Sequence, residues 1–466
     1  MLTVLIVATV ILVLINIGIG LRNRAGDNLS TFVAYKNQVK ALPISLSLIG
    51  TIVGGGMFFT VGEMGYQAGI APLSIALSYI PGFFLLSLTI KKIKELTSSQ
   101  NVDTLYDVIK TKIDSSGKWS DIYIITIATI NTIVYFFLLA GQFIVLAAFY
   151  DYFFHFTGET LMVMSVVVVG ISILVYSILG GVKKDIATDV YQSTWVIVVV
   201  IITALSITWK GNVFEGFQNL PQNHLNGLGY GFLFPVGVLL FYSPAFIGRY
   251  DFWQRIISSK DGRTAKISLW QSIPVILVTY CLFVYLGMFA RANAGDTTVA
   301  NVSVLWALEH IVPTWVFALV AVGLYAAVMS TADTLLNVST VSLWKIITII
   351  KNKPREDTRG FTQIKSLSLV VGILSVLIVL VVKSVVTVVV GALSSVVIFT
   401  PSILYILFSR NPKGKAATIS IVIPYLTFLV LFLSLPSLRL YAFVPCVILS
   451  ALILSIFAIF QKVTSK

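Results

Sequence analysis

Long apolar stretches separated by short polar segments run through the whole chain. A helix needs roughly 20 consecutive apolar residues to cross the hydrocarbon core of a bilayer. By this criterion the sequence predicts about thirteen transmembrane helices. They are expected near residues 2–21, 42–62, 70–93, 120–149, 160–180, 186–209, 229–256, 267–290, 314–346, 364–383, 385–408, 416–435 and 440–461. We therefore expect residues 1–466 to form a single all-α, polytopic membrane domain.

The composition and the distribution of charge agree with this interpretation. Of 466 residues, 57% are hydrophobic and 11% are charged, whereas a soluble domain has about 25% charged residues. Most of the 32 Lys and Arg fall in alternate loops, with Arg255 counted there as a helix-end residue. The exceptions are Lys210, Arg291, Lys383 and Arg439 in the other loops and Arg249 within a predicted helix.

Such a bias identifies the cytoplasmic loops, because Lys and Arg are retained on that side of the membrane. It predicts a multi-pass protein of the plasma (inner) membrane with its N-terminus outside and its C-terminus cytoplasmic. The net charge of +13 is then a matter of topology, so we expect a lipid bilayer and no nucleic acid as partner. We also expect the protein to function as a monomer.

Two of the predicted helices contain residues that interrupt a helix. Gly54, Gly55 and Gly56 follow one another in the second helix, and Pro235 and Pro244 lie in the seventh. Glycine also allows close packing and proline also produces simple kinks, and both are common in membrane helices. The two interruptions lie five helices apart, however, and corresponding breaks in two halves indicate a transporter with a binding site at the membrane midplane.

Because five is an odd number, the second half would be inverted relative to the first. The sequence therefore predicts a five-plus-five inverted repeat with one leading and two trailing helices. Residues 1–41 would form the leading helix and its loop, 42–209 the first repeat, 229–408 the second repeat, and 416–466 the two trailing helices.

Few ionisable residues lie within the predicted helices: Glu63, Asp189, Arg249, Asp251 and Asp333. Such residues are costly in a bilayer and usually face a cavity or a partner. Asp333 lies midway along its helix and shares one helical face with Ser330, Thr334 and Asn337. Hydroxyl groups in membrane helices often bond only to their own backbone. Opposite the free carbonyls of a broken helix, however, this face favours a cation site made of oxygens.

Enzymatic function is not indicated. No G-x-G-x-x-G, P-loop, G-x-S-x-G or H-E-x-x-H motif occurs in the sequence, and no paired catalytic groups are evident. His155, His224 and His310 all fall between predicted helices. We expect a transporter without a cofactor, in which an ion provides the coupling.

Four segments resemble the sodium:solute symporter family. They are the broken helix at 47–69, the G-G-x(6)-T-D-x-x-Q stretch ending at Gln192, the triplet Trp253-Gln254-Arg255, and the A-A-x-M-S-T-x-D stretch within 326–339. The resemblance implies a five-plus-five fold and Na⁺-coupled symport. It implies a main sodium site formed by Gly50, Val53, Ala327, Ser330 and Thr331. A second cation site would be formed by Asp189, Ser330, Asp333 and Thr334, although Asp333 stands where the family members considered have a hydroxyl.

The substrate pocket departs further from the sugar-transporting members of the family. The residues expected to line it are Gly54, Gly55, Gly56, Met57, Tyr242 and Phe246. Sugar recognition needs many placed hydrogen-bond partners, so a small organic solute with a carboxylate, such as an amino acid, is favoured over a sugar. Arg249 is expected either to attract an anion or to form a gate pair with Asp251. Proton coupling and a solute sensor that does not transport are the alternatives.

Overall fold

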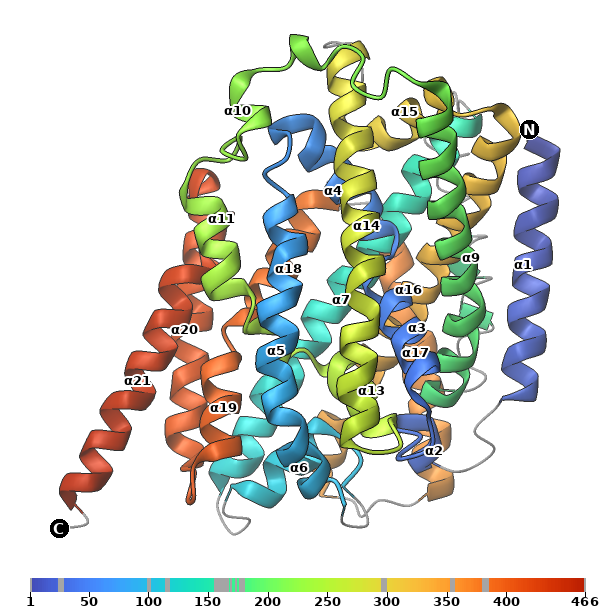
Figure 1. The fold of residues 1–466 in the computed structure, drawn as a ribbon. Coiled ribbons are helices and arrows are strands. Elements are labelled where there is room, and N and C mark those ends of the chain that lie inside the picture. Colours follow the sequence, from blue (N-terminus) through green and yellow to red (C-terminus); the bar gives the residue numbers. More distant parts are fainter. Residues whose placement is uncertain are drawn as a thin grey trace.

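The computed structural model describes residues 2–23, 29–98, 102–113, 118–154, 181–294, 300–352, 357–378 and 385–464, with a few positions between 167 and 175. This part of the chain is a bundle of helices (Figure 1). A helix satisfies its own backbone hydrogen bonds, which is why long apolar segments adopt it in lipid. The predicted all-α, multi-span fold is confirmed.

The first half of the chain contains α1 (Leu2–Arg22), α2 (Leu29–Val33), α3 (Ala41–Ile52), α4 (Gly55–Ala68), α5 (Leu73–Leu96), α6 (Leu105–Lys112), α7 (Lys118–Phe154) and α9 (Gly181–Lys210). The helices α2 and α6 are short and lie at one end of the bundle (Figure 1). The predicted span near 160–180 falls almost entirely outside the described residues.

The second half contains α10 (Gln222–Leu225), α11 (Leu233–Gly237), a π-helical turn η2 (Val238–Tyr242), α12 (Ala245–Gly248), α13 (Tyr250–Ser258), α14 (Gly262–Ala294), α15 (Ser303–Ile311), α16 (Thr314–Ile350), α17 (Asp357–Leu377), α18 (Val385–Val397), α19 (Thr400–Phe408), α20 (Gly414–Ser434) and α21 (Phe443–Thr464). Among the described residues, 9 helices are long and apolar enough to cross a membrane, or 10 with α3 and α4 counted as one bent span. Two shorter apolar helices, 9–22 and 233–242, coincide with further predicted spans.

The first predicted interruption separates α3 from α4, whose axes differ by 53°. The break itself comprises Val53 and Gly54. A Cβ added to Gly54 would lie 1.9 Å from Oγ1 of Thr331 on α16. Glycine at this position therefore permits the unwound backbone to approach α16 more closely than any other residue would.

The second interruption is spread over a longer segment. Pro235 lies inside α11, and the π-helical turn η2 and a turn at Ser243 follow before Pro244 precedes α12. Arg249 then has extended backbone angles (φ −78°, ψ 115°) between α12 and α13. The seventh predicted helix is thus divided into short segments, and Arg249 lies in the extended backbone between two of them.

The helix α16 lies at the centre of the bundle and packs against α3, α4, α7, α9 and α13. Every residue from Gly323 to Ser342 is buried, including the hydroxyl and carboxyl groups predicted to bind a cation. By contrast, α1 and α21 lie at opposite edges (Figure 1), and only 22% of the apolar window of α21 is buried. The polar face of α16 is therefore enclosed by protein and not by lipid.

Close packing of α4 on α14 gives a first prediction. A Cβ added to Gly287 would lie 2.1 Å from the backbone oxygen of Gly62, which cannot move away as a side chain could. Gly287→Ala is expected to destabilise the protein by about 1–3 kcal/mol, the usual cost of overpacking. The matched control is Gly18→Ala on α1, where nothing lies within 4 Å. Equal thermal unfolding midpoints of the two purified variants would contradict this packing.

Candidate ion and solute site

The unwound end of α3 meets α16 through a backbone oxygen and a hydroxyl group. The hydroxyl of Thr331 donates to the carbonyl oxygen of Gly50 at 2.9 Å and to that of Ala327 at 3.1 Å. The last carbonyls of a helix have no partner within it, and the helix break leaves that of Gly50 available to α16. Three residues of the predicted main sodium site are thereby brought into contact.

Ser330, the next predicted ligand, lies beside the same glycine. A Cβ on Gly50 would lie 2.4 Å from Oγ of Ser330 and 2.7 Å from Oγ of Ser193 on α9. The hydroxyl of Ser330 donates to Oδ1 of Asp189 at 2.5 Å. Glycine at position 50 is thus required for α3, α9 and α16 to converge around one point. Val53, the remaining predicted ligand, lines a small cavity of about 20 Å³ together with Ala327.

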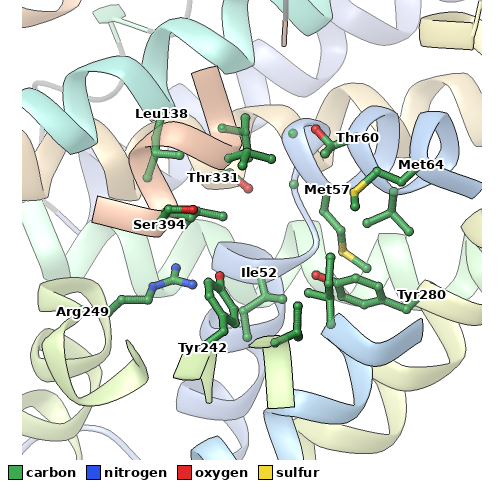
Figure 2. A pocket seen from close by; sticks show the side chains of 18 of the residues that line it. Ile52, Met57, Thr60, Met64, Leu138, Tyr242, Arg249, Tyr280, Thr331 and Ser394 are labelled. Atoms are coloured by element: carbon green, nitrogen blue, oxygen red, sulfur yellow. The ribbon is translucent and has the colours of Figure 1, made fainter. Parts of the chain in front are cut away.

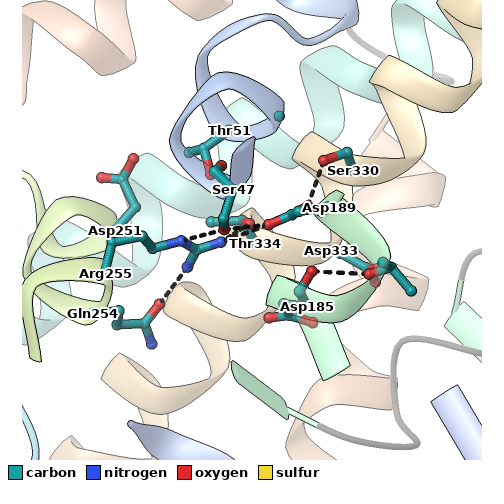
Figure 3. A network of polar contacts seen from close by, with 12 residues as sticks. Ser47, Thr51, Asp185, Asp189, Asp251, Gln254, Arg255, Ser330, Asp333 and Thr334 are labelled. Atoms are coloured by element: carbon teal, nitrogen blue, oxygen red, sulfur yellow. Dashed lines mark hydrogen bonds and ion pairs between the residues drawn. The ribbon is translucent and has the colours of Figure 1, made fainter. Parts of the chain in front are cut away.

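Asp189 is the carboxylate at the centre of this polar cluster (Figure 3). Besides the bond from Ser330, its Oδ2 accepts hydrogen bonds from the hydroxyl of Ser47 at 2.5 Å and from Nη2 of Arg255 at 3.1 Å. These partners come from α16, α3 and α13, and all of them are buried. A buried carboxylate is tolerated when it is paired and hydrogen-bonded, so this cluster joins four helices through one side chain.

Arg255 lies in the last turn of α13, but it is buried and does not belong to a loop exposed to water. Its side chain is 1% exposed, and it donates to Oγ of Ser47 at 3.0 Å and to Oγ1 of Thr334 at 2.6 Å (Figure 3). Because guanidinium has five donors and stays charged, it can hold both hydroxyls and Asp189 at once. Thr334, predicted as a cation ligand, therefore binds a guanidinium.

Asp333, the other predicted carboxylate, lies in a separate ion pair. Its Oδ2 accepts from Nζ of Lys184 at 2.5 Å, and the same ammonium lies 3.4 Å from Oδ1 of Asp185. Lys184, Asp185 and Asp333 are each 1% exposed or less. The structure thus brings together Asp189, Ser330 and Thr334 of the predicted second site and pairs Asp333 with a lysine beside them.

Sequence reasoning missed Lys184, Asp185 and Ser47 as members of this cluster. Lys184 and Asp185 were assigned to a short cytoplasmic loop, whereas α9 begins at Gly181 and includes both. One signal was available, because Asp185 and Asp189 are four residues apart and so lie on the same face of a helix. No comparable pattern marks Lys184, whose partner is 149 residues away in the sequence.

A cavity of about 150 Å³ lies beside the break in α3–α4 (Figure 2). One water needs roughly 10–15 Å³ by this measure, so the cavity has room for a small organic molecule. Apolar side chains line most of it, and the polar groups on its wall include Thr60, Tyr79, Gln142, Tyr280, Thr331 and Ser394. Thr331 therefore belongs both to the cavity wall and to the contact with Gly50.

Of the residues predicted to form the substrate pocket, Gly54, Gly56, Met57 and Tyr242 line this cavity. The other two, Gly55 and Phe246, are not part of its lining. A Cβ on Gly55 would meet Val328 at 2.2 Å, so that residue faces α16. Phe246 is fully buried against the rings of Tyr79 and Phe83, one layer behind the wall.

The first turn of α4 borders the cavity, and one of its amides has a side-chain partner. The N–H of Gly56 donates to Oε1 of Gln142 on α7 at 3.2 Å. The N-cap residue is Gly54, which has no side chain that could cap the helix. The start of a helix attracts anionic groups because its N–H groups point outwards and its dipole is positive there.

Arg249 lines the cavity (Figure 2), and it is also paired with Asp251. Its Nε and Nη2 donate to the two carboxylate oxygens of Asp251 at 3.1 and 2.5 Å. The hydroxyl of Tyr135 donates to Oδ1 of the same carboxylate at 2.6 Å. The structure thus contains the Arg249–Asp251 pair that was expected as one alternative. Arg249 also lies on the cavity wall, where it could attract an anion, which was the other alternative.

These features define a class of protein: an all-helical membrane carrier whose two interrupted helices border a central cavity and an oxygen-rich polar cluster. Residues 32–423 match the Sodium:solute symporter family, and the chain belongs to that family. The predicted family and its inverted-repeat fold are confirmed, and the protein is a transporter and not an enzyme. The family implies Na⁺ and a solute as the transported ligands. No curated protein matches the sequence.

Solved structures show the same fold at low identity. A Na⁺-coupled sialic acid symporter, in a substrate-bound outward-open state, is 13% identical with a TM-score of 0.79, and the match covers 98% of this chain and 97% of that one. A nucleobase-cation-symport-1 family transporter, in a closed conformation with bromovinylhydantoin bound, is 14% identical with a TM-score of 0.57, and the match covers 91% of this chain and 93% of that one. A manganese transporter of Eremococcus coleocola is 14% identical with a TM-score of 0.51, and the match covers 93% of this chain and 97% of that one. At these identities the likeness concerns the fold alone.

The pairing of Arg255 with Asp189 gives a second prediction. Arg255→Met leaves a buried carboxylate without its cation, which typically costs 3–5 kcal/mol, whereas removing both charges is often close to neutral. We expect a large loss of thermal stability in Arg255→Met and recovery of much of it in Arg255→Met/Asp189→Asn. Unfolding is measured in a sodium-free potassium buffer. Additive losses in the double variant would show that the two side chains do not stabilise each other.

Proposed function

We propose that the protein is a Na⁺-coupled symporter of a small organic solute, with its sodium bound by Gly50, Val53, Ala327, Ser330 and Thr331. The observation that carries this proposal is the position of Thr331. Its hydroxyl contacts the carbonyls of Gly50 and Ala327, and its side chain also lines the solute-sized cavity. A cation bound there and a molecule in the cavity would therefore contact the same side chain.

Sodium suits this site because hard cations prefer oxygen ligands. The ion would replace the hydrogen bond between Thr331 and Gly50 and would bind the hydroxyl and both carbonyls at the same time. In doing so it would fix the unwound end of α3 against α16. Only Val53 and Gly54 separate α3 from the start of α4, so the same ion would set the position of the first amides of α4.

A solute with a carboxylate, such as an amino acid, is favoured by two features of the cavity. The start of α4, where Gly54 provides no side-chain cap, borders it, and the guanidinium of Arg249 lies on its wall. Gln142 occupies the amide of Gly56 in this structure, and a carboxylate would compete for that amide. The apolar wall argues against a sugar, whose hydroxyl groups would be costly to bury without partners.

Transport would proceed by alternating access. Residues of the bent α3–α4 segment and of the divided segment from α11 to Arg249 both line the cavity, as expected for a site between repeats that move relative to each other. Release of the Arg249–Asp251 pair would open one path. The orientation that we propose, with the N-terminus outside and the C-terminus in the cytoplasm of the plasma membrane, follows from the distribution of Lys and Arg.

The sodium site gives a third prediction. Ser330→Ala and Thr331→Ala each remove one oxygen ligand, so the Na⁺ concentration for half-maximal binding is expected to rise about tenfold, equivalent to about 1.4 kcal/mol. Binding of radiolabelled Na⁺ to purified protein measures this. Ser339→Ala on the same helix is the control, because that hydroxyl donates to the backbone of Thr132 at 3.1 Å, away from the site. Unchanged Na⁺ affinity in both site variants would refute the assignment.

The solute class gives a fourth prediction. Carboxylic acids and their matching amides are screened by thermal unfolding in sodium and in potassium buffer. An acid at a hundredfold excess over its Kd should stabilise the protein by about 2.7 kcal/mol, and only with sodium present, whereas its amide should not. Stabilisation by sugars alone would contradict the proposed solute class.

The same screen distinguishes sodium coupling from proton coupling, and a transport assay that follows it distinguishes a transporter from a sensor. Stabilisation that depends on pH and not on sodium would favour a proton-coupled symporter. An acid that stabilises the protein is then tested for accumulation in proteoliposomes under an inward Na⁺ gradient. Binding without accumulation would identify a sensor that has kept the transporter fold.

A further inference from the structure

The polar cluster next to the proposed sodium site contains cations that belong to the chain itself. Five charged side chains are buried there, namely Lys184, Asp185, Asp189, Arg255 and Asp333, and none is more than 1% exposed. They come from α9, α13 and α16. Charges at such depth are retained when they are paired or serve a function, so the partner of each carboxylate matters for what else can bind.

Arg255 occupies the oxygens that a second sodium would need. Its guanidinium donates to Oδ2 of Asp189 at 3.1 Å and to Oγ1 of Thr334 at 2.6 Å (Figure 3). A guanidinium has no acceptor and stays charged under all conditions of interest. Two of the four residues expected to form the second cation site are therefore already bound to a permanent cation.

Lys184 occupies a third of those residues in the same way. Its ammonium lies 2.5 Å from Oδ2 of Asp333 and 3.4 Å from Oδ1 of Asp185. Displacing it from Asp333 would break the shorter of its two ion pairs inside the bundle, and breaking a buried pair is costly. The one remaining residue of the expected second site is Ser330, and Ser330 is also a proposed ligand of the main sodium site.

The charges of the cluster leave room for one more monovalent cation. With its acidic side chains ionised, the cluster carries three negative charges on Asp185, Asp189 and Asp333 and two positive charges on Lys184 and Arg255. The proposed main sodium site is separated from this cluster by one hydroxyl, since Ser330 donates to Oδ1 of Asp189. With all three carboxylates ionised, a single Na⁺ at the main site would make the whole buried assembly neutral, whereas a second Na⁺ would give it a net positive charge.

We propose that Lys184 and Arg255 are tethered cations that take the place of a second sodium, so that the protein binds one Na⁺ per chain. This inference rests on the main sodium site of the proposed function and adds its stoichiometry. Both tethered cations stay with the protein throughout the cycle, so neither draws energy from the sodium gradient. Solute accumulation would then be driven by one ion per cycle.

The test is the stoichiometry of radiolabelled Na⁺ binding to purified full-length protein, with potassium replacing sodium in the background. We expect saturation at one Na⁺ per chain with a Hill coefficient of about one. Saturation at two would overturn the inference while leaving the proposed main site intact. Absence of Na⁺ binding would overturn the proposed main site itself, so the two failures are distinguishable.

A pair of variants tests the role of the ammonium group. Lys184→Met removes the charge at similar length and frees the carboxylates of both Asp333 and Asp185, so binding should rise to two Na⁺ per chain. Lys184→Arg keeps a cation at the same position and should remain at one. If Lys184→Met stays folded by its thermal unfolding profile and still saturates at one, the assignment of Lys184 as a substitute for sodium is overturned. The wild-type stoichiometry decides the inference even if Lys184→Met does not fold.

Discussion

An interrupted helix inside a membrane must find partners for the backbone groups that it releases, and in this protein those partners come from α16. The hydroxyl of Thr331 binds the carbonyl of Gly50 at the end of α3. Water is not available in the bilayer core to do the same, and an unsatisfied backbone group there costs several kcal/mol. The bend in α3–α4, the cavity beside it and the proposed ion site all depend on this contact.

The contact in turn requires a particular set of residues around it. Glycine at positions 50 and 54 allows the backbone of α3 to approach within reach of Ser330 and Thr331, since a Cβ would overlap their hydroxyls. Asp189 accepts hydrogen bonds from Ser330 and Ser47 through its two carboxylate oxygens. Arg255 neutralises Asp189 and binds Thr334 one turn further along α16. Small residues create the space, and charged residues then fix α3, α9, α13 and α16 around it.

The sequence was sufficient for the parts of the structure that follow from local pattern. Apolar length located the spans, and the consecutive glycines located the first helix break within one or two residues. The depth of Lys184 and Arg255 was not predictable in this way, because a charged residue near a helix end resembles an interfacial one in any hydropathy profile. Their burial is decided by Asp333 and Asp189, which are distant in sequence. Similarly, Gly55 and Phe246 are adjacent to pocket residues but point elsewhere because of helix rotation, which periodicity alone does not fix.

In the proposed site, Thr331 would let an ion and a solute affect each other without a long pathway between them. Its hydroxyl contacts the carbonyls expected to bind the ion, and its side chain is part of the cavity wall. Gly54, which also lines the cavity, approaches the same side chain so closely that a Cβ would overlap it. Binding an ion at Thr331 would therefore fix the wall that a solute meets, and a solute would in turn favour the arrangement that holds the ion. Such coupling would be reciprocal by thermodynamic necessity, and in the proposed site Thr331 would carry it.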